Sequence, residues 1–363
     1  MSVSPPTVDA VRYAAIEDRL AALLRTRHDT LVIGGEAILA LEALARGVGG
    51  PDTHALNVVT GPYGAMMGHW LGASGGEVRT IEAADGHAIG ASELSAALAE
   101  RPTDVVCVVH GEAATGVVNP LAELAAVTRA AGAVLLVDAV ASVGAEPLEL
   151  DALGLDAVVI GPQKAMGGPA GVCGLCADDR TWELIDRNPA APRDSILSLA
   201  DLRDRWLRGG RRTLPFVPHH LEMLALDQAL GRLESEGLNA VVARHRRARD
   251  ATRAGLAGLG LKLWVADDIE AAAVATLVRP PAGIRPDAVL ARMRLPAVVE
   301  AAPGALAGAA LRVMHNGPAA SQHAALEAVV AIGDALAQLG VTVDLTLALA
   351  AAQAAWAARA ATS

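Results

Sequence analysis

The sequence predicts an α/β protein in which a large domain with a mostly parallel sheet is followed by a smaller α+β domain. Three observations predict this fold class. From about residue 30 to residue 179, short β-branched runs alternate with Ala- and Leu-rich stretches of helical period. Most of these runs are entirely apolar, as expected for strands that helices cover on both faces. After residue 179 the helical stretches become longer, and a second, shorter strand pattern begins.

The elements of the first part follow one another as strand and helix. Each predicted strand is a run of apolar, mostly branched residues bounded by turn residues. One predicted helix begins directly after Pro120, and proline favours the start of a helix. The predicted strands are Leu31–Ile33, Leu56–Val59, Val105–His110, Val134–Asp138 and Ala157–Ile160, and the predicted helices are Ala37–Arg46, Ala91–Leu98 and Leu121–Ala130.

The second part of the chain has its own pattern. Its Ala-rich final stretch has helical period, which predicts a terminal helix that packs on the small domain or on a neighbour. We therefore expect a large domain over residues 1–235, a small domain over 236–340 and a C-terminal helix within 341–363. The other predicted helices are Glu222–Ser235 and Ala240–Leu256, and the predicted strands are Lys262–Val265 and Ala273–Val278.

Composition excludes several classes of function. The 30 basic and 40 acidic side chains give a net charge of −10, and aromatic residues are only 2%, which argues against nucleic-acid or anionic-membrane partners. No apolar run is long enough to span a bilayer, and no leader segment opens the chain. Cys173 and Cys176 have the spacing of a zinc half-site, but no second pair lies nearby. We expect a soluble cytoplasmic protein without a metal site.

Two predicted strands end in reactive side chains. One ends at Asp138, and the other is followed by a Gly-Pro turn and then Lys164. Ligands of open parallel sheets bind at the carboxyl edge of the strands, so both side chains would point into one crevice. An amine can condense with a pyridine aldehyde, and a carboxylate can keep the ring nitrogen protonated. The alternative is an exposed turn lysine and an aspartate that only caps a helix.

Four segments, in this order along the chain, resemble class V aminotransferases of the alanine–glyoxylate type. The resemblance implies an aspartate-aminotransferase-like fold (PLP fold type I), a Schiff base at Lys164 and pairing of Asp138 with the ring nitrogen. It also places Thr115 beside the ring and implies that Arg312 binds the substrate carboxylate, which a planar guanidinium matches with two hydrogen bonds. The segments are 110–117 (HGEAATGV), 137–144 (VDAVASVG), 161–165 (GPQKA) and 311–317 (LRVMHNG).

Glu36 departs from the pattern of the phosphate-dependent members of this family. Their loop before the first helix offers glycine and small hydroxyl residues that bind the cofactor phosphate at a helix N-terminus. Here residues 34–42 read GGEAILALE, so a carboxylate stands where an anion should bind. Two like unit charges about 4 Å apart repel by roughly 4 kcal/mol at an effective dielectric of about 20. A neutral 5′-hydroxymethyl group could instead donate to Glu36, although the acid could also serve only the helix dipole.

This departure resembles family members for which free pyridoxamine is a substrate and not a bound cofactor. By that resemblance Tyr63 contacts the ring and Glu112 lies near its 3-hydroxyl group. Met67 is a candidate to stack on the ring, although its spacing also fits a core position. Gln163 precedes the lysine as in the phosphate-dependent members, and Thr213 follows a loop that reaches the neighbouring subunit in the family.

We therefore expect a transaminase that converts pyridoxamine and a pyruvate-like 2-oxo acid into pyridoxal and an amino acid. It would act as a homodimer or higher homo-oligomer without a tightly bound cofactor. One alternative is an ordinary class V aminotransferase that uses pyridoxal 5′-phosphate, with Arg211 or Arg212 neutralising the repulsion by Glu36. The other is an inactive ring-binding homologue, because Pro303 stands where a second carboxylate-binding arginine is expected.

Overall fold

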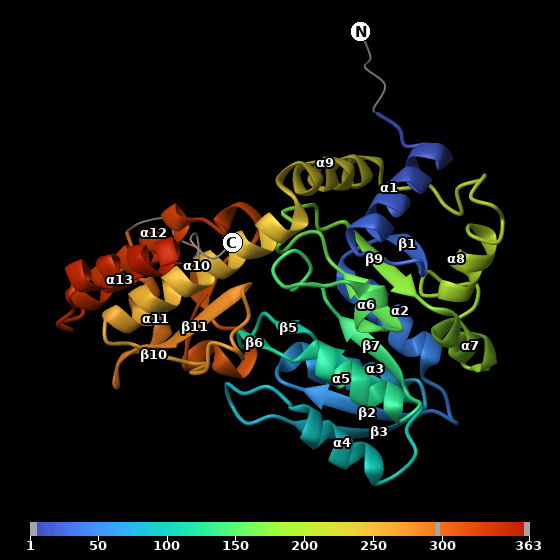
Figure 1. Ribbon diagram of the computed structural model, residues 1–363, viewed down its shortest axis with the longest axis horizontal. Coiled ribbons are helices and arrows are strands. Elements are labelled where there is room, and N and C mark those ends of the chain that lie inside the picture. The colour runs from blue at the N-terminus through green and yellow to red at the C-terminus, as the bar shows by residue number, and fades with distance from the viewer. Residues whose placement is uncertain (1–5, 295–297, 359–363) are drawn as a thin grey trace.

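A seven-stranded sheet forms the larger part of the computed structural model, which describes residues 6–294 and 298–358. Its strand order is β1-β9-β8-β7-β4-β2-β3, and helices flank it (Figure 1). Only β9 runs antiparallel to its neighbours, so the predicted mostly parallel sheet is confirmed. The strands are β1 (Asp29–Gly34), β2 (His54–Val59), β3 (Glu77–Glu82), β4 (Val105–Val109), β7 (Val134–Asp138), β8 (Ala157–Ile160) and β9 (Val172–Ala177).

The predicted strands were those with fully buried side chains. All residues of β4, β7 and β8 are buried, as their apolar runs indicate. The edge strand β3 was missed because polar residues interrupt its apolar ones, so its sequence has no apolar run. Its side chains are exposed or partly exposed. The helices around this sheet are α1 (Ala10–Leu23), α2 (Ala37–Val48), α3 (Pro62–Ala73), α4 (Ala91–Ala99), α5 (Leu121–Ala130), α6 (Leu150–Leu153), α7 (Asp179–Arg187), α8 (Leu199–Arg205) and α9 (His220–Glu236).

A second, four-stranded sheet lies beside the first and is antiparallel throughout, in the order β10-β11-β13-β12. The expected strand Lys262–Val265 is only two residues long, and the expected strand Ala273–Val278 begins two residues later. The division of the chain at residues 235 and 340 stays a prediction. The elements here are β10 (Lys262–Leu263), β11 (Ala275–Arg279), β12 (Val299–Ala301), β13 (Leu311–Met314), α10 (Leu238–Gly258), α11 (Pro286–Leu290), α12 (Gln322–Gln338) and α13 (Leu345–Ala358).

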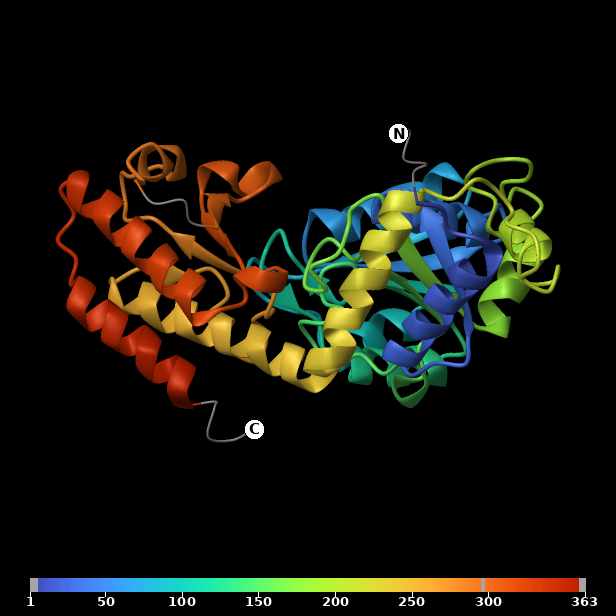
Figure 2. The same cartoon turned by 90° about the horizontal axis from the view of Figure 1, so that it is seen from above.

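The long helix α10 connects the two parts. Helices α9 and α10 meet at a sharp angle at Gly237, whose φ of 84° is in the region that favours glycine (Figure 2). Arg246 on α10 forms an ion pair of 3.0 Å with Glu146, which follows β7. The other carboxylate oxygen of Glu146 accepts a hydrogen bond of 2.8 Å from the amide of Ala273. One buried acid therefore ties the edge of the large sheet to both α10 and the segment that enters β11.

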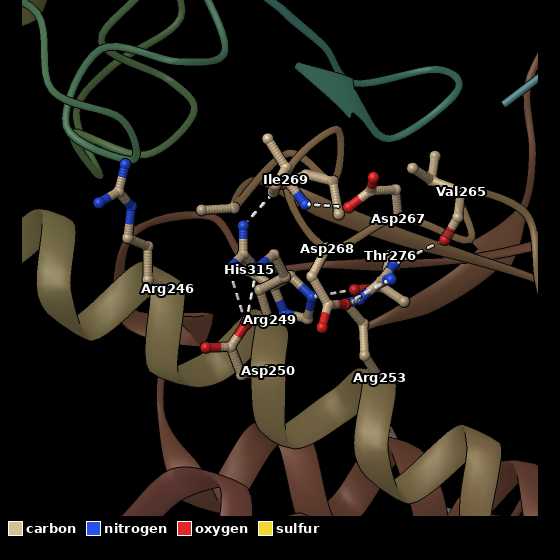
Figure 3. A network of polar contacts seen from close by, with 12 residues as sticks. Arg246, Arg249, Asp250, Arg253, Val265, Asp267, Asp268, Ile269, Thr276 and His315 are labelled. Atoms are coloured by element: carbon tan, nitrogen blue, oxygen red, sulfur yellow. Dashed lines mark hydrogen bonds and ion pairs between the residues drawn. The ribbon is translucent and has the colours of Figure 1, made fainter. Parts of the chain in front are cut away.

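Two further arginines of α10 hold the loop that precedes β11 (Figure 3). Arg249 donates to the carbonyl oxygen of Ala271 at 2.7 Å, and Arg253 donates to the carboxylate of Asp268 at 2.8 Å. From the sequence alone, the arginine-rich run 244–249 was interpreted as a solvated helix face. Most of the Arg249 and Arg253 side chains are buried, so they anchor the loop and do not form a solvated charged face.

Helix α13 lies alongside α10, as Figure 2 shows. The two helices approach closely where Gly258 faces the backbone of Ala348. The predicted terminal helix therefore exists and packs against α10 and α12 of the same chain.

None of the described helices combines the length and the apolar character that crossing a membrane requires. Cys107, Cys173 and Cys176 are buried free thiols. Within residues 6–294 and 298–358, no group of three or more His, Cys, Asp or Glu side chains gathers in a way that could hold a metal ion.

Replacing Gly258 by alanine should destabilise the contact between α10 and α13. The new Cβ would lie 2.7 Å from the Cα atom of Ala348, so the helices must move apart. We expect a loss of about 1–2 kcal/mol in the free energy of unfolding, measured by urea denaturation. Gly231→Ala in α9 is the matched control, because its Cβ would come no closer than 3.6 Å to Arg19. The control should gain about 0.5–1 kcal/mol, and equal effects of the two substitutions would contradict the packing argument.

Candidate active site

Asp138 and Lys164 meet at the carboxyl edge of the large sheet, as the sequence predicted. Asp138 is the last residue of β7, and Lys164 follows β8 after a short turn. Both line the same pocket. The pocket is lined by Glu36, Ala37, Ile38, Leu41, Tyr63, Val109, Gly111, Ala113, Asp138, Val140, Ala141 and Lys164.

The Asp138 carboxylate is buried at the floor of this pocket and is 5% exposed. It accepts a hydrogen bond of 2.9 Å from the amide of Val140. Burial raises its pKa to about 6; Glu36 adds to the increase, while Lys164 opposes it. Among the described residues, no side chain forms a hydrogen bond or an ion pair with the Lys164 amine, which leaves it available to a ligand.

Glu112 is a second buried carboxylate near the pocket. It is fully buried and accepts hydrogen bonds from the amides of Gly64 at 3.3 Å and Ala114 at 3.2 Å. Burial raises its pKa to about 7, and repulsion by Asp138 is the second cause. Gly61 permits this placement, because a Cβ there would lie 2.4 Å from the Glu112 side chain. The two acids therefore share one region of low solvent access and influence each other's ionisation.

Tyr63 and Thr115 come from two turns that the structure joins. The hydroxyl of Thr115 is buried and donates to the carbonyl oxygen of Thr60 at 3.0 Å. Tyr63 is in the first turn of α3 and lines the pocket. Burial raises its pKa; Arg312 opposes the increase, and the nearby carboxylates add to it. Thr115 thus fixes the turn between β2 and α3 that carries Tyr63 to the pocket.

Glu36 is the N-cap residue of α2 and lines the pocket while remaining exposed. Its carboxylate accepts a hydrogen bond of 2.8 Å from the amide of Ile38 and one of 2.5 Å from the side-chain amide of Gln163. Glu36 therefore satisfies the free amides of the helix N-terminus with its own charge. Gln163 adjoins Lys164 and ties this cap to the turn that carries the lysine.

Arg312 reaches this region from β13 of the small sheet. Its Nη1 atom donates to the carbonyl oxygen of Ala113 at 2.9 Å, and its Nη2 atom pairs with Glu300 at 2.8 Å. The Nε atom is buried and has no hydrogen-bond partner within the described part of the chain. A guanidinium with an unsatisfied donor beside the pocket wall suits a carboxylate ligand.

Three residues that the sequence suggested for the site do not lie with the other site residues at the pocket. Met67 is 1% exposed and packs in the core of the large sheet, away from the pocket lining. Thr213 is exposed on a loop and does not line the pocket of its own chain. Arg211 pairs with Glu17 and Asp18, so within one chain it is not available to neutralise Glu36.

Sequence reasoning missed two features of the site. The apolar wall that includes Ile38, Leu41 and Val140 had no chemical signal, because such residues are ordinary in helices and strands. The pairing of Arg312 with Glu300 depends on the register between β12 and β13, where the two residues are direct partners. No local pattern in the sequence gives that register.

The fold is that of the fold type I aminotransferases, as solved structures similar to it show. A family model described as "Aminotransferase class-V" matches residues 11–277. The chain belongs to the class V aminotransferases, and it is therefore a transaminase, as predicted.

Individual relatives have more specific functions. The chain is 34% identical over 331 residues to pyridoxamine–pyruvate transaminase of Mesorhizobium japonicum, covering 90% of this chain and 84% of that protein. A crystal structure of pyridoxamine-pyruvate aminotransferase from Mesorhizobium loti has a TM-score of 0.91 at 32% identity and covers 96% and 89% of the two chains. Ureidoglycine-glyoxylate aminotransferase from Bacillus subtilis has a TM-score of 0.88 at 25% identity, covering 97% and 93%.

The family corrects one expectation about the cofactor. Class V aminotransferases and structural neighbours of the chain are pyridoxal 5′-phosphate-dependent enzymes, so the expectation of no tightly bound cofactor is wrong. The residues present fit the ring of that cofactor, because the floor of the pocket holds a buried carboxylate and its wall an unpaired lysine. The expectation was wrong because it rested on Glu36 alone, a single charge at the pocket wall.

Glu112→Gln should gain stability relative to the unmodified protein as the pH rises. The pKa of Glu112 is raised from 4.5 to about 7 by folding, so its stabilising contribution is complete below about pH 4.5 and is lost as the pH rises through about 7. Glutamine does not ionise and escapes this loss, which corresponds to about 3 kcal/mol. Urea denaturation at a series of pH values measures the difference.

The control for this experiment is Glu77→Gln. Glu77 is exposed, and its hydrogen bond to Arg101 lowers the pKa, so its contribution changes only below the ordinary pKa of a glutamate. Its stability difference from the unmodified protein should be constant between about pH 5 and pH 8. Glutamine at position 112 also loses one acceptor oxygen, but that cost does not depend on pH. A pH-independent difference for Glu112→Gln would contradict the raised pKa.

Proposed function

We propose that this transaminase accepts unphosphorylated pyridoxamine as an amino donor and transfers the amino group to a pyruvate-like 2-oxo acid. The observation that carries the proposal is the Glu36 carboxylate at the N-terminus of α2, held there by Ile38 and Gln163. It offers a neutral 5′-hydroxymethyl group an acceptor and repels a phosphate dianion. The relatives named for pyridoxamine and pyruvate support the same substrate pair.

Lys164 and Asp138 would act on the ring. Lys164 is the amine that condenses with the carbonyl of pyridoxal, and after its release it moves the proton between the substrate carbon atoms. Asp138 pairs with the protonated ring nitrogen, which allows the ring to accept electrons from the reacting carbon. Burial raises the pKa of Asp138 only to about 6, below neutral pH, so most of the carboxylate is ionised for this pairing at pH 7.

The remaining site residues would position the substrates. Glu112 faces the 3-hydroxyl side of the ring, and Tyr63 contacts the ring from the turn that Thr115 holds in place. Arg312 binds the carboxylate of the 2-oxo acid through donors that the protein does not satisfy. Met67 would support α3 from the core, because it is buried among apolar side chains.

We also propose that the chain acts as a homodimer in the cytoplasm. Val217 and Leu221 are 80% and 69% exposed, which supports burial against a second copy. Thr213 lies on the same loop and would then approach the partner's site. The three buried free cysteines support a reducing compartment. Sedimentation velocity tests the oligomeric state, and a monomer at micromolar concentration would contradict the dimer.

The direct test of the function is amino transfer from free pyridoxamine to pyruvate. We expect alanine and pyridoxal to form in equal amounts. Chromatography of the reaction mixture measures both products. A chain that uses only pyridoxamine 5′-phosphate as donor would instead be an ordinary class V aminotransferase, and one that binds the ring without turnover would be an inactive homologue. Lys164→Ala should abolish both the transfer and the visible absorbance that pyridoxal gains on binding. Absorbance that persists in this variant would remove the role assigned to the lysine.

Glu36→Ser should shift the donor preference toward the phosphorylated ring. The substitution removes one negative charge near the 5′ substituent of the ring. The kcat/KM for pyridoxamine 5′-phosphate, divided by the kcat/KM for pyridoxamine, should therefore rise by about tenfold or more. Glu42→Gln is the matched control, since Glu42 is on the same helix and pairs with Arg46. An unchanged ratio in Glu36→Ser would contradict the proposed role of this acid.

A further inference from the structure

Glu300 occupies one of the donor groups of Arg312, the residue that we propose binds the substrate carboxylate. The two residues face each other on β12 and β13, and their side chains form an ion pair of 2.8 Å. The Arg312 side chain is 11% exposed, whereas the Glu300 side chain is 52% exposed. Glu300 therefore lies toward solvent and Arg312 toward the interior.

The other donors of Arg312 face inward. Its Nη1 atom is fixed by the carbonyl oxygen of Ala113, a residue of the pocket wall, and its Nε atom is buried without a partner. A carboxylate that binds the guanidinium with two oxygens must therefore approach next to Glu300 or displace it from Nη2. The protein places a carboxylate of its own in competition with the ligand.

We propose that Glu300 is a specificity-determining residue that selects 2-oxo acids with a single carboxylate. This inference rests on the proposed role of Arg312 in binding the acceptor carboxylate. A monocarboxylate such as pyruvate exchanges with Glu300 and leaves only one negative ligand on the arginine. A dicarboxylate such as 2-oxoglutarate brings a second negative charge close to the displaced Glu300 carboxylate, and like charges repel.

This arrangement also suits the ring substrate. Pyridoxamine has no carboxylate, so during its half of the reaction no ligand neutralises Arg312. Glu300 then keeps the guanidinium paired, which avoids an uncompensated charge beside a site that must receive an amine. When the 2-oxo acid enters, Glu300 can turn into solvent at small cost because half of its side chain is already exposed.

The test compares the kcat/KM of pyruvate with that of 2-oxoglutarate. In Glu300→Gln the preference for pyruvate should fall about tenfold, mainly through a lower KM for 2-oxoglutarate, because an exposed like-charge interaction is lost. Glu300→Asp should keep most of the preference, since it retains the charge. In the unmodified protein the preference should decrease with added NaCl, whereas in Glu300→Gln it should not.

Controls separate this inference from the proposed function. Glu100→Gln removes another exposed glutamate that pairs with an arginine, Arg79, far from the site, and it should leave the preference unchanged. If free pyridoxamine is not a donor, the same ratio is measured with pyridoxamine 5′-phosphate. Calorimetric titration of each acid into the protein gives the binding preference even without turnover. An equal preference in Glu300→Gln and the unmodified protein, by kinetics or calorimetry, overturns the proposal.

Discussion

The site depends on two carboxyl groups that lie close together in a place that water barely reaches. Glu112 and Asp138 are both buried, burial raises the pKa of each, and Asp138 raises the pKa of Glu112 further. Backbone amides recover part of this cost, but only a cation can recover more. The Lys164 amine is one such cation, because it lowers the pKa of Asp138, and the ring nitrogen that we propose to pair with Asp138 would be a second. Binding of a cationic group in this pocket and the ionisation of these acids are therefore linked.

The second constraint is the joint between the two sheets. Arg312 belongs to the small sheet, yet it is anchored on the carbonyl oxygen of Ala113, in the turn that follows β5 (Gly111–Glu112). The distance between Lys164 and Arg312, which we propose binds the substrate carboxylate, is therefore set by the position of the small sheet. Glu146 fixes that position through Arg246 and Ala273, using both of its oxygen atoms. A mutation at this joint can change the binding of the 2-oxo acid without touching any residue of the pocket.

The sequence predicted those features that depend on neighbours along the chain. Asp138 and Lys164 were found because parallel strands bring their carboxyl ends to one edge, so a strand-end position is sufficient. For Met67 the sequence did not decide between a pocket and a core position, since its helical spacing fits both equally well. Glu300 could not be found at all, because its contact with Arg312 follows from strand register between distant segments. Strand β3 was not predicted because an edge strand that contains polar residues has no apolar run.

Glu36 connects the local structure of α2 with the choice of ring. A carboxylate has about four acceptor positions, and the Ile38 and Gln163 donors use two of them, so capping the helix does not prevent binding of an alcohol. A phosphate, in contrast, needs the same helix amides that Glu36 now occupies. To admit the phosphorylated ring of its family, the chain must turn Glu36 away and lose its cap, which costs about 1 kcal/mol before any repulsion is counted. The helix cap would therefore add to the preference for an uncharged 5′ substituent that we propose for Glu36.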